Sequence, residues 1–263
     1  MTFVDSPVQA YRSKSLFHVS PETKAEEVLR ELQERGISSL PVVRDDVLLG
    51  IVSITDLARV GCMTFPGFVA TGPSGDGRNA EQVMTTPVVT VDDQDPLWRA
   101  ARKMLEHHIH RVVVTREDKP VGLIATRDMM AAVRDARVER KLADVVTRHV
   151  ETIDVDASID RAVAALAESN VRGLVVVDGE WPVGVFTRLE AIYAQSLPAG
   201  LRAQAVEHIM SYETICFDQS TPLYRVAGHA VAMAARRILA VEDRKLVGVA
   251  TGFDLARVVA DVW

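Results

Sequence analysis

The 263-residue sequence has few of the features that mark a membrane, secreted or metal-binding protein. No apolar run approaches the roughly 18 residues that a membrane-spanning helix needs. The start, Met1-Thr2-Phe3-Val4-Asp5, lacks the basic and then apolar pattern of a signal peptide. Its two cysteines, Cys62 and Cys216, have no Cys or His partner at metal-ligand spacing. We therefore expect a cytoplasmic protein with reduced, buried or half-buried thiols, no metal site and no membrane insertion.

An excess of positive charge is also missing. The formal net charge is −6 and no segment is strongly basic, which argues against a nucleic-acid partner but not against a local basic pocket for one small anion. No Ser-His-Asp, paired-carboxylate or zinc-hydrolase spacing stands out, so no catalytic residue is assigned. We expect a binding protein and not an enzyme.

The main feature that is present is a four-fold internal repeat, in register with Gly50, Gly122, Gly184 and Gly248. An apolar residue lies 31 positions before each glycine. Six residues after this apolar residue, an apolar stripe with i, i+3, i+4, i+7 spacing begins. This spacing predicts a helix with one buried face. The stripes are Ala25-Val28-Leu29-Leu32, Leu97-Ala100-Ala101-Met104, Ile159-Ala162-Val163-Leu166 and Leu223-Val226-Ala227-Ala230. Thr23, Asp95 and Thr221 are predicted N-caps, with Pro96 and Pro222 at the first helical position.

Two short apolar runs follow each stripe, separated by a polar turn, and they predict a β-hairpin. A second apolar helix closes each unit, so the fold class is α/β (α+β) with four β-α-β-β-α repeats. The predicted boundaries are 8–60, 80–134, 142–196 and 205–263. The Gly- and Pro-rich segment 61–79 is expected to be a flexible loop, and 129–146 a nearly continuous helix between repeats 2 and 3.

The strand with the aligned glycine leads into Ser/Thr-x-x-Asp, as in Gly50-Ile-Val-Ser53-Ile-Thr-Asp56 and Gly248-Val-Ala-Thr251-Gly-Phe-Asp254. Repeats 2 and 3 carry imperfect versions that end in Asp128 and Glu190. Together with Met84-Thr85-Thr86-Pro87 and Ile109-His110-Arg111-Val112, this pattern resembles the CBS domain, named after cystathionine β-synthase. The resemblance covers about residues 8 to 260.

The resemblance implies that repeats 1+2 and 3+4 pair into two pseudo-two-fold (Bateman) modules, which can pack as a disc. It also implies clefts that bind AMP, ADP, ATP or S-adenosylmethionine as regulatory ligands and not as catalytic cofactors. The expected partners are an enzyme, a transporter or a second copy in a homodimer. A structural interaction module with unoccupied clefts is the alternative function, and an enzyme that uses the cleft ranks below both.

The Ser/Thr-x-x-Asp element allows two interpretations. The hydroxyl and carboxylate can cap the following helix, which requires no ligand. The carboxylate can also accept hydrogen bonds from a ribose diol. The candidate ribose and adenosine residues are Ser53, Asp56, Asp128, Thr187, Glu190, Thr251 and Asp254. The pattern favours Asp56 and Asp254, because Ala125 removes the hydroxyl in repeat 2 and Glu190 is one methylene longer.

Basic residues recur just before the first hairpin strand in three repeats. They are His110, Arg111, Arg172, Arg236 and Arg237, and Ser38-Ser39 takes their place in repeat 1. Such residues can be solvated surface cations. Within the family that the chain resembles, they reach nucleotide phosphates, and the guanidinium fork suits a phosphate. The site in repeat 1 is accordingly expected to lack a phosphate clamp or to hold a neutral adenosyl group.

Overall fold

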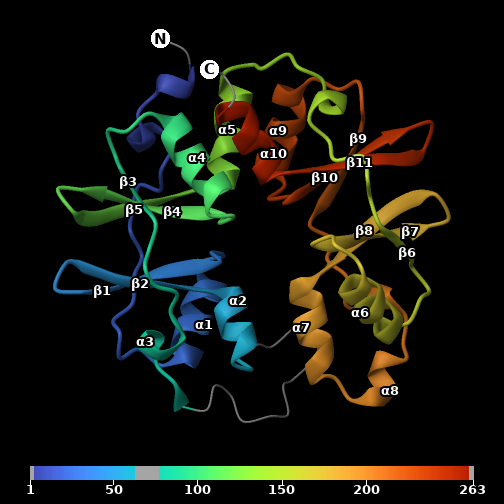
Figure 1. The fold of residues 1–263 in the computed structure, drawn as a ribbon, viewed down its shortest axis with the longest axis horizontal. Coiled ribbons are helices and arrows are strands. Elements are labelled where there is room, and N and C mark those ends of the chain that lie inside the picture. Colours follow the sequence, from blue (N-terminus) through green and yellow to red (C-terminus); the bar gives the residue numbers. More distant parts are fainter. Residues whose placement is uncertain (1–2, 63–76, 261–263) are drawn as a thin grey trace. The chain divides into compact units, whose positions relative to one another are not determined.

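The computed structural model describes residues 3–62 and 77–260, which form two compact units (Figure 1). Unit 1 contains the described parts of 1–12, 94–111 and 124–263, and unit 2 those of 13–93 and 112–123. Most of the predicted flexible loop at 61–79, including 63–76, lies outside the described residues.

Repeats 2, 3 and 4 each contain a strand, a helix, a hairpin and a helix, as predicted. Their elements are β3 (Thr90–Asp92), α4 (Leu97–Glu106), β4 (Arg111–Arg116), β5 (Lys119–Ala125) and α5 (Thr126–Asp135); β6 (Thr152–Asp154), α6 (Ile159–Glu168), β7 (Gly173–Asp178), β8 (Trp181–Thr187) and α7 (Arg188–Ser196); and β9 (Thr214–Asp218), α9 (Leu223–Ala232), β10 (Arg237–Glu242), β11 (Lys245–Thr251) and α10 (Gly252–Ala260). Each repeat forms a three-stranded sheet whose middle strand is β4, β7 or β10. The mixed α/β fold class is confirmed.

Repeat 1 has α1 (Ala25–Glu34), β1 (Ser39–Arg44), β2 (Val47–Ser53) and α2 (Ile54–Arg59), but its opening strand is reduced to a single bridge between Val19 and Val42. The equivalent strands end with a backbone N–H that donates to the middle strand, as Asp93 does to Thr115 O at 2.9 Å. Pro21 holds this position in repeat 1 and has no N–H to donate. The sheet of repeat 1 therefore has only two strands.

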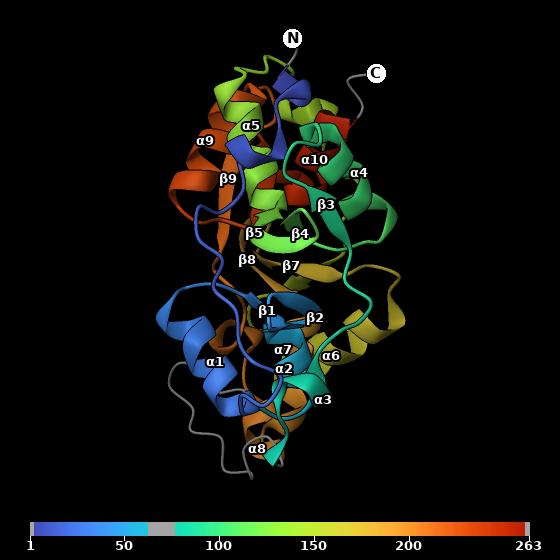
Figure 2. The same ribbon diagram turned by 90° about the vertical axis from the view of Figure 1, so that its left-hand side faces the viewer.

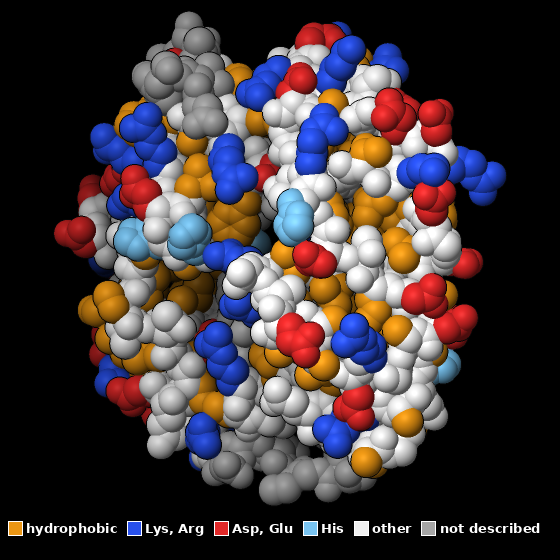
Figure 3. All heavy atoms as spheres, turned by 45° about the vertical axis from the view of Figure 1, so that its right-hand side comes forward, with side chains coloured by type: hydrophobic (Ala, Val, Ile, Leu, Met, Phe, Trp, Pro, Cys, Tyr) orange, Lys and Arg blue, Asp and Glu red, His pale blue; other side chains and the backbone are white. Residues whose placement is uncertain are grey.

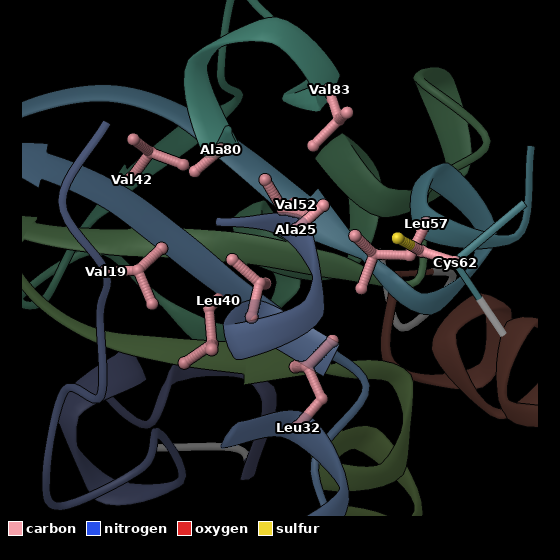
Figure 4. Close-up of a cluster of buried hydrophobic side chains, with 11 residues drawn as sticks. Val19, Ala25, Leu32, Leu40, Val42, Val52, Leu57, Cys62, Ala80 and Val83 are labelled. Carbon is pink, nitrogen blue, oxygen red and sulfur yellow. The ribbon is translucent and has the colours of Figure 1, made fainter. Parts of the chain in front are cut away.

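The predicted apolar stripes form the core. Ala25, Val28 and Leu32 of α1 are fully buried, as are all four stripe residues of α4 and of α9. In unit 2 the stripe of α1 packs with Leu40 and Val52 of the hairpin and with the short helix α3 (Ala80–Val83) (Figure 4). Neither cysteine forms a disulfide, and Cys62 is buried and Cys216 half-buried, as expected.

The repeats are joined in pairs by reciprocal exchange of their leading segments. Val8, Ala80, Leu142 and Val206 each lie 42 positions before an aligned glycine, and each is buried. The backbone N–H of each donates to a carbonyl of the other repeat in its pair, namely those of Asp95, Thr23, Thr221 and Ala157, at 2.7–2.9 Å. This exchange pairs repeat 1 with repeat 2 and repeat 3 with repeat 4.

The exchanged segments also explain why the aligned positions Gly50 and Gly248 are occupied by glycine. A Cβ added at Gly248 would lie 2.8 Å from Cβ of Val146, and one at Gly50 would lie 2.3 Å from Sδ of Met84. Val146 and Met84 both belong to exchanged segments, four residues after Leu142 and Ala80. The glycine strand has no side chain here because the segment from the paired repeat crosses it closely.

Two predictions about helix ends are wrong. Helices α1, α4 and α9 begin one residue later than predicted, so Lys24, Pro96 and Pro222 are their N-cap residues. Thr23, Asp95 and Thr221 lie one residue before the caps, where their backbone carbonyls accept N–H groups of the exchanged segments. The continuous helix over 129–146 is also absent. Helix α5 stops at Asp135, and Arg137 takes a left-handed conformation with φ 51°.

Four helices pack together in unit 1. Helix α10 contacts α4 and α5, and α5 also contacts α9 (Figure 2). Helices from repeats 2 and 4 are thereby joined, and their N-terminal ends carry Asp128 and Asp254.

Candidate functional site

The four carboxylates of the Ser/Thr-x-x-Asp elements sit in the same local geometry, at the point where a hairpin strand gives way to a helix. One oxygen of each accepts the backbone N–H three residues earlier: Ser53 to Asp56 at 2.9 Å, Ala125 to Asp128 at 2.7 Å, Thr187 to Glu190 at 2.8 Å and Thr251 to Asp254 at 2.8 Å. This is the capping bond that the sequence predicts. The longer side chain of Glu190 does not prevent it.

The hydroxyl groups reinforce three of these caps. Ser53 Oγ donates to Asp56 at 2.5 Å, Thr251 Oγ1 donates to Asp254 at 2.9 Å, and Thr187 Oγ1 donates to Glu190. In each case the hydroxyl bonds the same oxygen that accepts the backbone N–H. Asp128 receives no such bond, because residue 125 is alanine.

The five predicted phosphate residues come together in unit 1, where we refer to them as the basic cluster. They lie just before or at the start of β4, β7 and β10, so the cluster draws on repeats 2, 3 and 4. Burial, followed by the charges of Arg111, Arg237, Arg172 and Arg236, lowers the pKa of His110 to about 4. The whole cluster is therefore close enough to act on one imidazole, which is neutral at pH 7.

The arginines repel one another, and nearby carboxylates offset this only in part. Burial and the charge of Arg236 lower the pKa of Arg111 to about 10, against an opposing effect of Asp128. Burial also lowers the pKa of Arg237. Arg236 pairs with Glu213 at 2.8 Å, whereas Arg172 makes no ion pair with the residues that the structure describes. With a pKa of about 10, Arg111 remains charged at neutral pH.

An aromatic residue that the sequence analysis did not select lies within the cluster. The Phe253 ring is centred 4.3 Å from that of His110, and the Arg172 guanidinium carbon lies 5.9 Å from its centroid. Phe253 stands one residue before Asp254, where the other repeats have Thr55, Arg127 and Leu189. Because this position varies among the repeats, periodicity alone gave no reason to choose it.

Two helix N-termini meet beside these residues. A Cβ at Gly252, the first residue of α10, would lie 2.5 Å from Oγ1 of Thr126, the first residue of α5. Both helices are long enough to carry a positive N-terminal dipole, and each has its carboxylate in the first turn. Burial raises the pKa of Asp128 to about 6, against opposing effects of its hydrogen bond to Ala125 N, Arg127 and Arg111.

The two candidate residues in unit 2 have different surroundings. Asp56 receives Thr85 Oγ1 at 3.4 Å and lies 3.5 Å from the exposed Arg59. Ser39, which corresponds to Arg111, is buried and pairs with Ser53 across the hairpin. Ser38 and Ser39 carry no charge at the position where the other repeats have basic residues, and the absence of a phosphate clamp in repeat 1 stays a prediction.

The chemistry available in unit 1 is anion binding together with hydrogen-bond acceptance. Within residues 3–62 and 77–260, no three His, Cys, Asp or Glu side chains come together in a way that could hold a metal ion. On the face in Figure 3, acidic and basic side chains are interspersed, so that face carries no broad basic surface. No helix in the described part of the chain is long and apolar enough to cross a membrane.

Comparison with known proteins identifies the family. The CBS domain model matches residues 8–61, 80–135 and 142–196, together more than half of the chain, so the chain belongs to the CBS domain family. Protein MJ1404 of Methanocaldococcus jannaschii is 25% identical over an alignment of 283 positions. The alignment covers 98% of this chain and 63% of that protein.

A solved structure shows the same fold over nearly the whole chain. Protein MJ1225 from Methanocaldococcus jannaschii, proposed to be an archaeal homologue of γ-AMPK, aligns with 96% of this chain and 99% of its own with a TM-score of 0.75 at 18% identity. The CBS domain pair of protein MJ0100 was solved with 5′-methylthioadenosine and S-adenosyl-L-methionine. It aligns with 48% of this chain and 98% of its own, with a TM-score of 0.41 at 23% identity.

Proposed function

We propose that this chain is a regulatory protein that binds an adenine nucleotide (AMP, ADP, ATP) or another adenosyl ligand and has no catalytic activity of its own. The observation that carries this proposal is the basic cluster. Four arginines and a histidine from three repeats lie close enough for the arginine charges to act on the histidine, and nearby carboxylates offset these charges only in part. Held cations that repel one another are stabilised by a polyanion, and phosphate is the anion that guanidinium groups fit best.

Each part of the ligand has candidate partners. The phosphates would contact the basic cluster, aided by the N-terminal dipoles of α5 and α10. The ribose would bond those carboxylates of the Ser/Thr-x-x-Asp elements whose second oxygen is open, because the capping bonds use only one oxygen of each carboxylate. Ser53, Thr187 and Thr251 would hold the carboxylates of their own elements in position.

The fourth repeat belongs to the same proposal. Residues 205–263 contain the strand, helix, hairpin and helix of repeats 2 and 3, and their leading segment exchanges with repeat 3. We treat 205–263 as a fourth CBS repeat and 142–196 with 205–263 as one Bateman module. Ligand binding at the junction of the repeats would then change the shape presented to an enzyme, a transporter or a second copy of the chain.

The capping geometry favours a second candidate. All four carboxylates form capping bonds that need no ligand, so this chain could be a structural interaction module with unoccupied clefts. The basic cluster separates the two candidates, because capping gives no reason for arginines from three repeats to converge.

The test is a thermal-shift panel with AMP, ADP, ATP, NAD and S-adenosylmethionine, followed by calorimetry. A ligand that binds only the folded state adds about 2.7 kcal/mol of stability at a hundredfold excess over Kd. We expect at least one adenosine compound to do so. A flat panel that calorimetry also finds flat would favour the structural module.

A second measurement locates the phosphate. Arg111→Ala should weaken a phosphorylated ligand by roughly 1.5–3 kcal/mol through the loss of a charge-assisted hydrogen bond, and weaken adenosine far less. Equal losses for the nucleotide and for adenosine would remove Arg111 from the phosphate role.

A further inference from the structure

The four carboxylates differ in what holds their second oxygen. In repeat 4 the exposed Arg257 donates from Nη1 to Asp254 Oδ1 at 2.7 Å, while Thr251 holds Oδ2. Both oxygens of the buried Asp254 are therefore engaged within its own helix turn.

Repeat 1 has a looser version of this arrangement. Arg59 lies 3.5 Å from Asp56 Oδ1, and Thr85 Oγ1 donates to the same oxygen at 3.4 Å. The sequence shows the shared cause, because repeats 1 and 4 both read Asp-Leu-Ala-Arg, so that an arginine follows each aspartate by one helical turn.

Repeats 2 and 3 lack this arginine. Ala131 and Tyr193 stand three residues after Asp128 and Glu190. Asp128 Oδ1 and Glu190 Oε1 have no hydrogen-bond partner among the described residues, since the capping bonds use only Oδ2 and Oε2. Each also faces a cluster arginine, because the charges of Asp128 and Glu190 act on Arg111 and Arg237, respectively.

We infer that Arg257 occupies the second carboxylate oxygen of Asp254 and so prevents repeat 4 from binding a ribose diol. The carboxylates that accept hydrogen bonds from a ribose diol are then those of Asp128 and Glu190. Each of these two open carboxylates combines a free oxygen with a cation of the basic cluster. In repeat 1 the carboxylate of Asp56 is partly engaged by Arg59, and the uncharged Ser38-Ser39 stands where the other repeats have basic residues. This inference rests on the proposed function, and it reverses the preference for Asp56 and Asp254 that the sequence pattern gives.

The experiment counts ribose-selective sites by calorimetry, with AMP and its 2′-deoxy analogue on the full chain. Wild type should show two sites that prefer AMP by about tenfold or more, the size expected for a lost hydrogen bond to a charged group. Asp128→Asn and Glu190→Gln should each remove the preference at one site. Asp254→Asn should leave both sites unchanged.

A variant that gains a ribose-selective site distinguishes the inference from a folding defect, because a misfolded protein would lose sites and not gain one. Arg257→Met preserves the apolar stem of the side chain but frees Asp254 Oδ1, so it should add a ribose-selective site. Arg161→Met removes another exposed arginine of unit 1 that makes no ion pair with any described residue, and it should change nothing.

Three outcomes would overturn the inference: loss of a ribose-selective site in Asp254→Asn, unchanged ribose selectivity in both Asp128→Asn and Glu190→Gln, or an unchanged site number in Arg257→Met. A wild-type protein that binds no adenosine compound at all would instead overturn the proposed function.

Discussion

At the scale of single residues, His110 and Asp128 titrate in overlapping pH ranges with opposite effects on stability. The pKa of His110 falls from 6.5 to about 4 on folding, so its contribution to stability is present above pH 6.5 and is lost as the pH falls towards 4. The pKa of Asp128 rises from 3.8 to about 6, so its contribution is present below pH 3.8 and is lost as the pH rises through 6.

Substituting the two residues one at a time should therefore separate their opposite contributions to the pH dependence of the unfolding free energy. Between about pH 4 and 6, the unfolding free energy of Asp128→Asn relative to wild type should increase with pH. That of His110→Gln relative to wild type should decrease with pH. Urea unfolding at several pH values measures both differences. Parallel slopes for the two variants would contradict the opposite pKa shifts.

At the scale of elements, the exchanged segments set which backbone positions tolerate a side chain. A Cβ at Gly248 would meet Cβ and Cγ2 of Val146 at 2.8 Å and the carbonyl oxygen of Thr147 at 3.1 Å. The β-branched Val146 cannot move aside easily. A Cβ at Gly50 would meet Sδ, Cγ and Cβ of Met84 at 2.3, 2.6 and 2.9 Å, and a change of rotamer would move the first two of these atoms but not the third.

Gly248→Ala and Gly50→Ala should accordingly each lower the unfolding free energy by about 1–3 kcal/mol through overpacking. Gly200→Ala is the matched control, because it lies in helix α8 (Ala199–Arg202) with no atom within 4 Å of the added Cβ. Chemical denaturation measures all three. If Gly248→Ala and Gly200→Ala unfold at the same denaturant concentration, the close crossing does not restrict the strand.

At the scale of the whole molecule, a chain of net charge −6 gathers positive side chains from three repeats into one cluster. Burial lowers the pKa of both Arg111 and Arg237, which means that their charge is disfavoured in the folded protein without ligand. Such an arrangement lowers the stability of the protein without ligand, and under the proposed function a bound phosphate would offset this cost.

Arg237→Met keeps much of the apolar stem and removes the charge. In the absence of ligand, its melting temperature should equal or exceed that of wild type. With a saturating phosphorylated ligand, the order should reverse, because the variant loses a phosphate contact. Differential scanning calorimetry with and without ligand measures both states. A variant that melts earlier without ligand and keeps the full ligand-induced shift would contradict this trade-off.

The sequence by itself determined the repeat, the element order and the buried faces. Stripes such as Leu97-Ala100-Ala101-Met104 predicted helices correctly because apolar spacing of 3.6 residues reports directly on one-sided burial. The capping bonds of Asp56, Asp128, Glu190 and Asp254 also followed from local spacing, since donor and acceptor lie three residues apart. The opening strand of repeat 1 is an exception, because Pro21 has no backbone N–H to donate and the predicted strand is reduced to a single bridge.

Only the tertiary structure decided how these local pieces meet. The sequence showed that basic residues recur before β4, β7 and β10, but not that four arginines act on the imidazole of His110. It aligned the glycines without showing that a segment from the paired repeat crosses Gly50, Gly184 and Gly248. It contained Asp-Leu-Ala-Arg twice without revealing that Arg257 donates to the second oxygen of Asp254. These features depend on residues far apart in the chain or on side-chain rotamers, and periodicity carries information about neither.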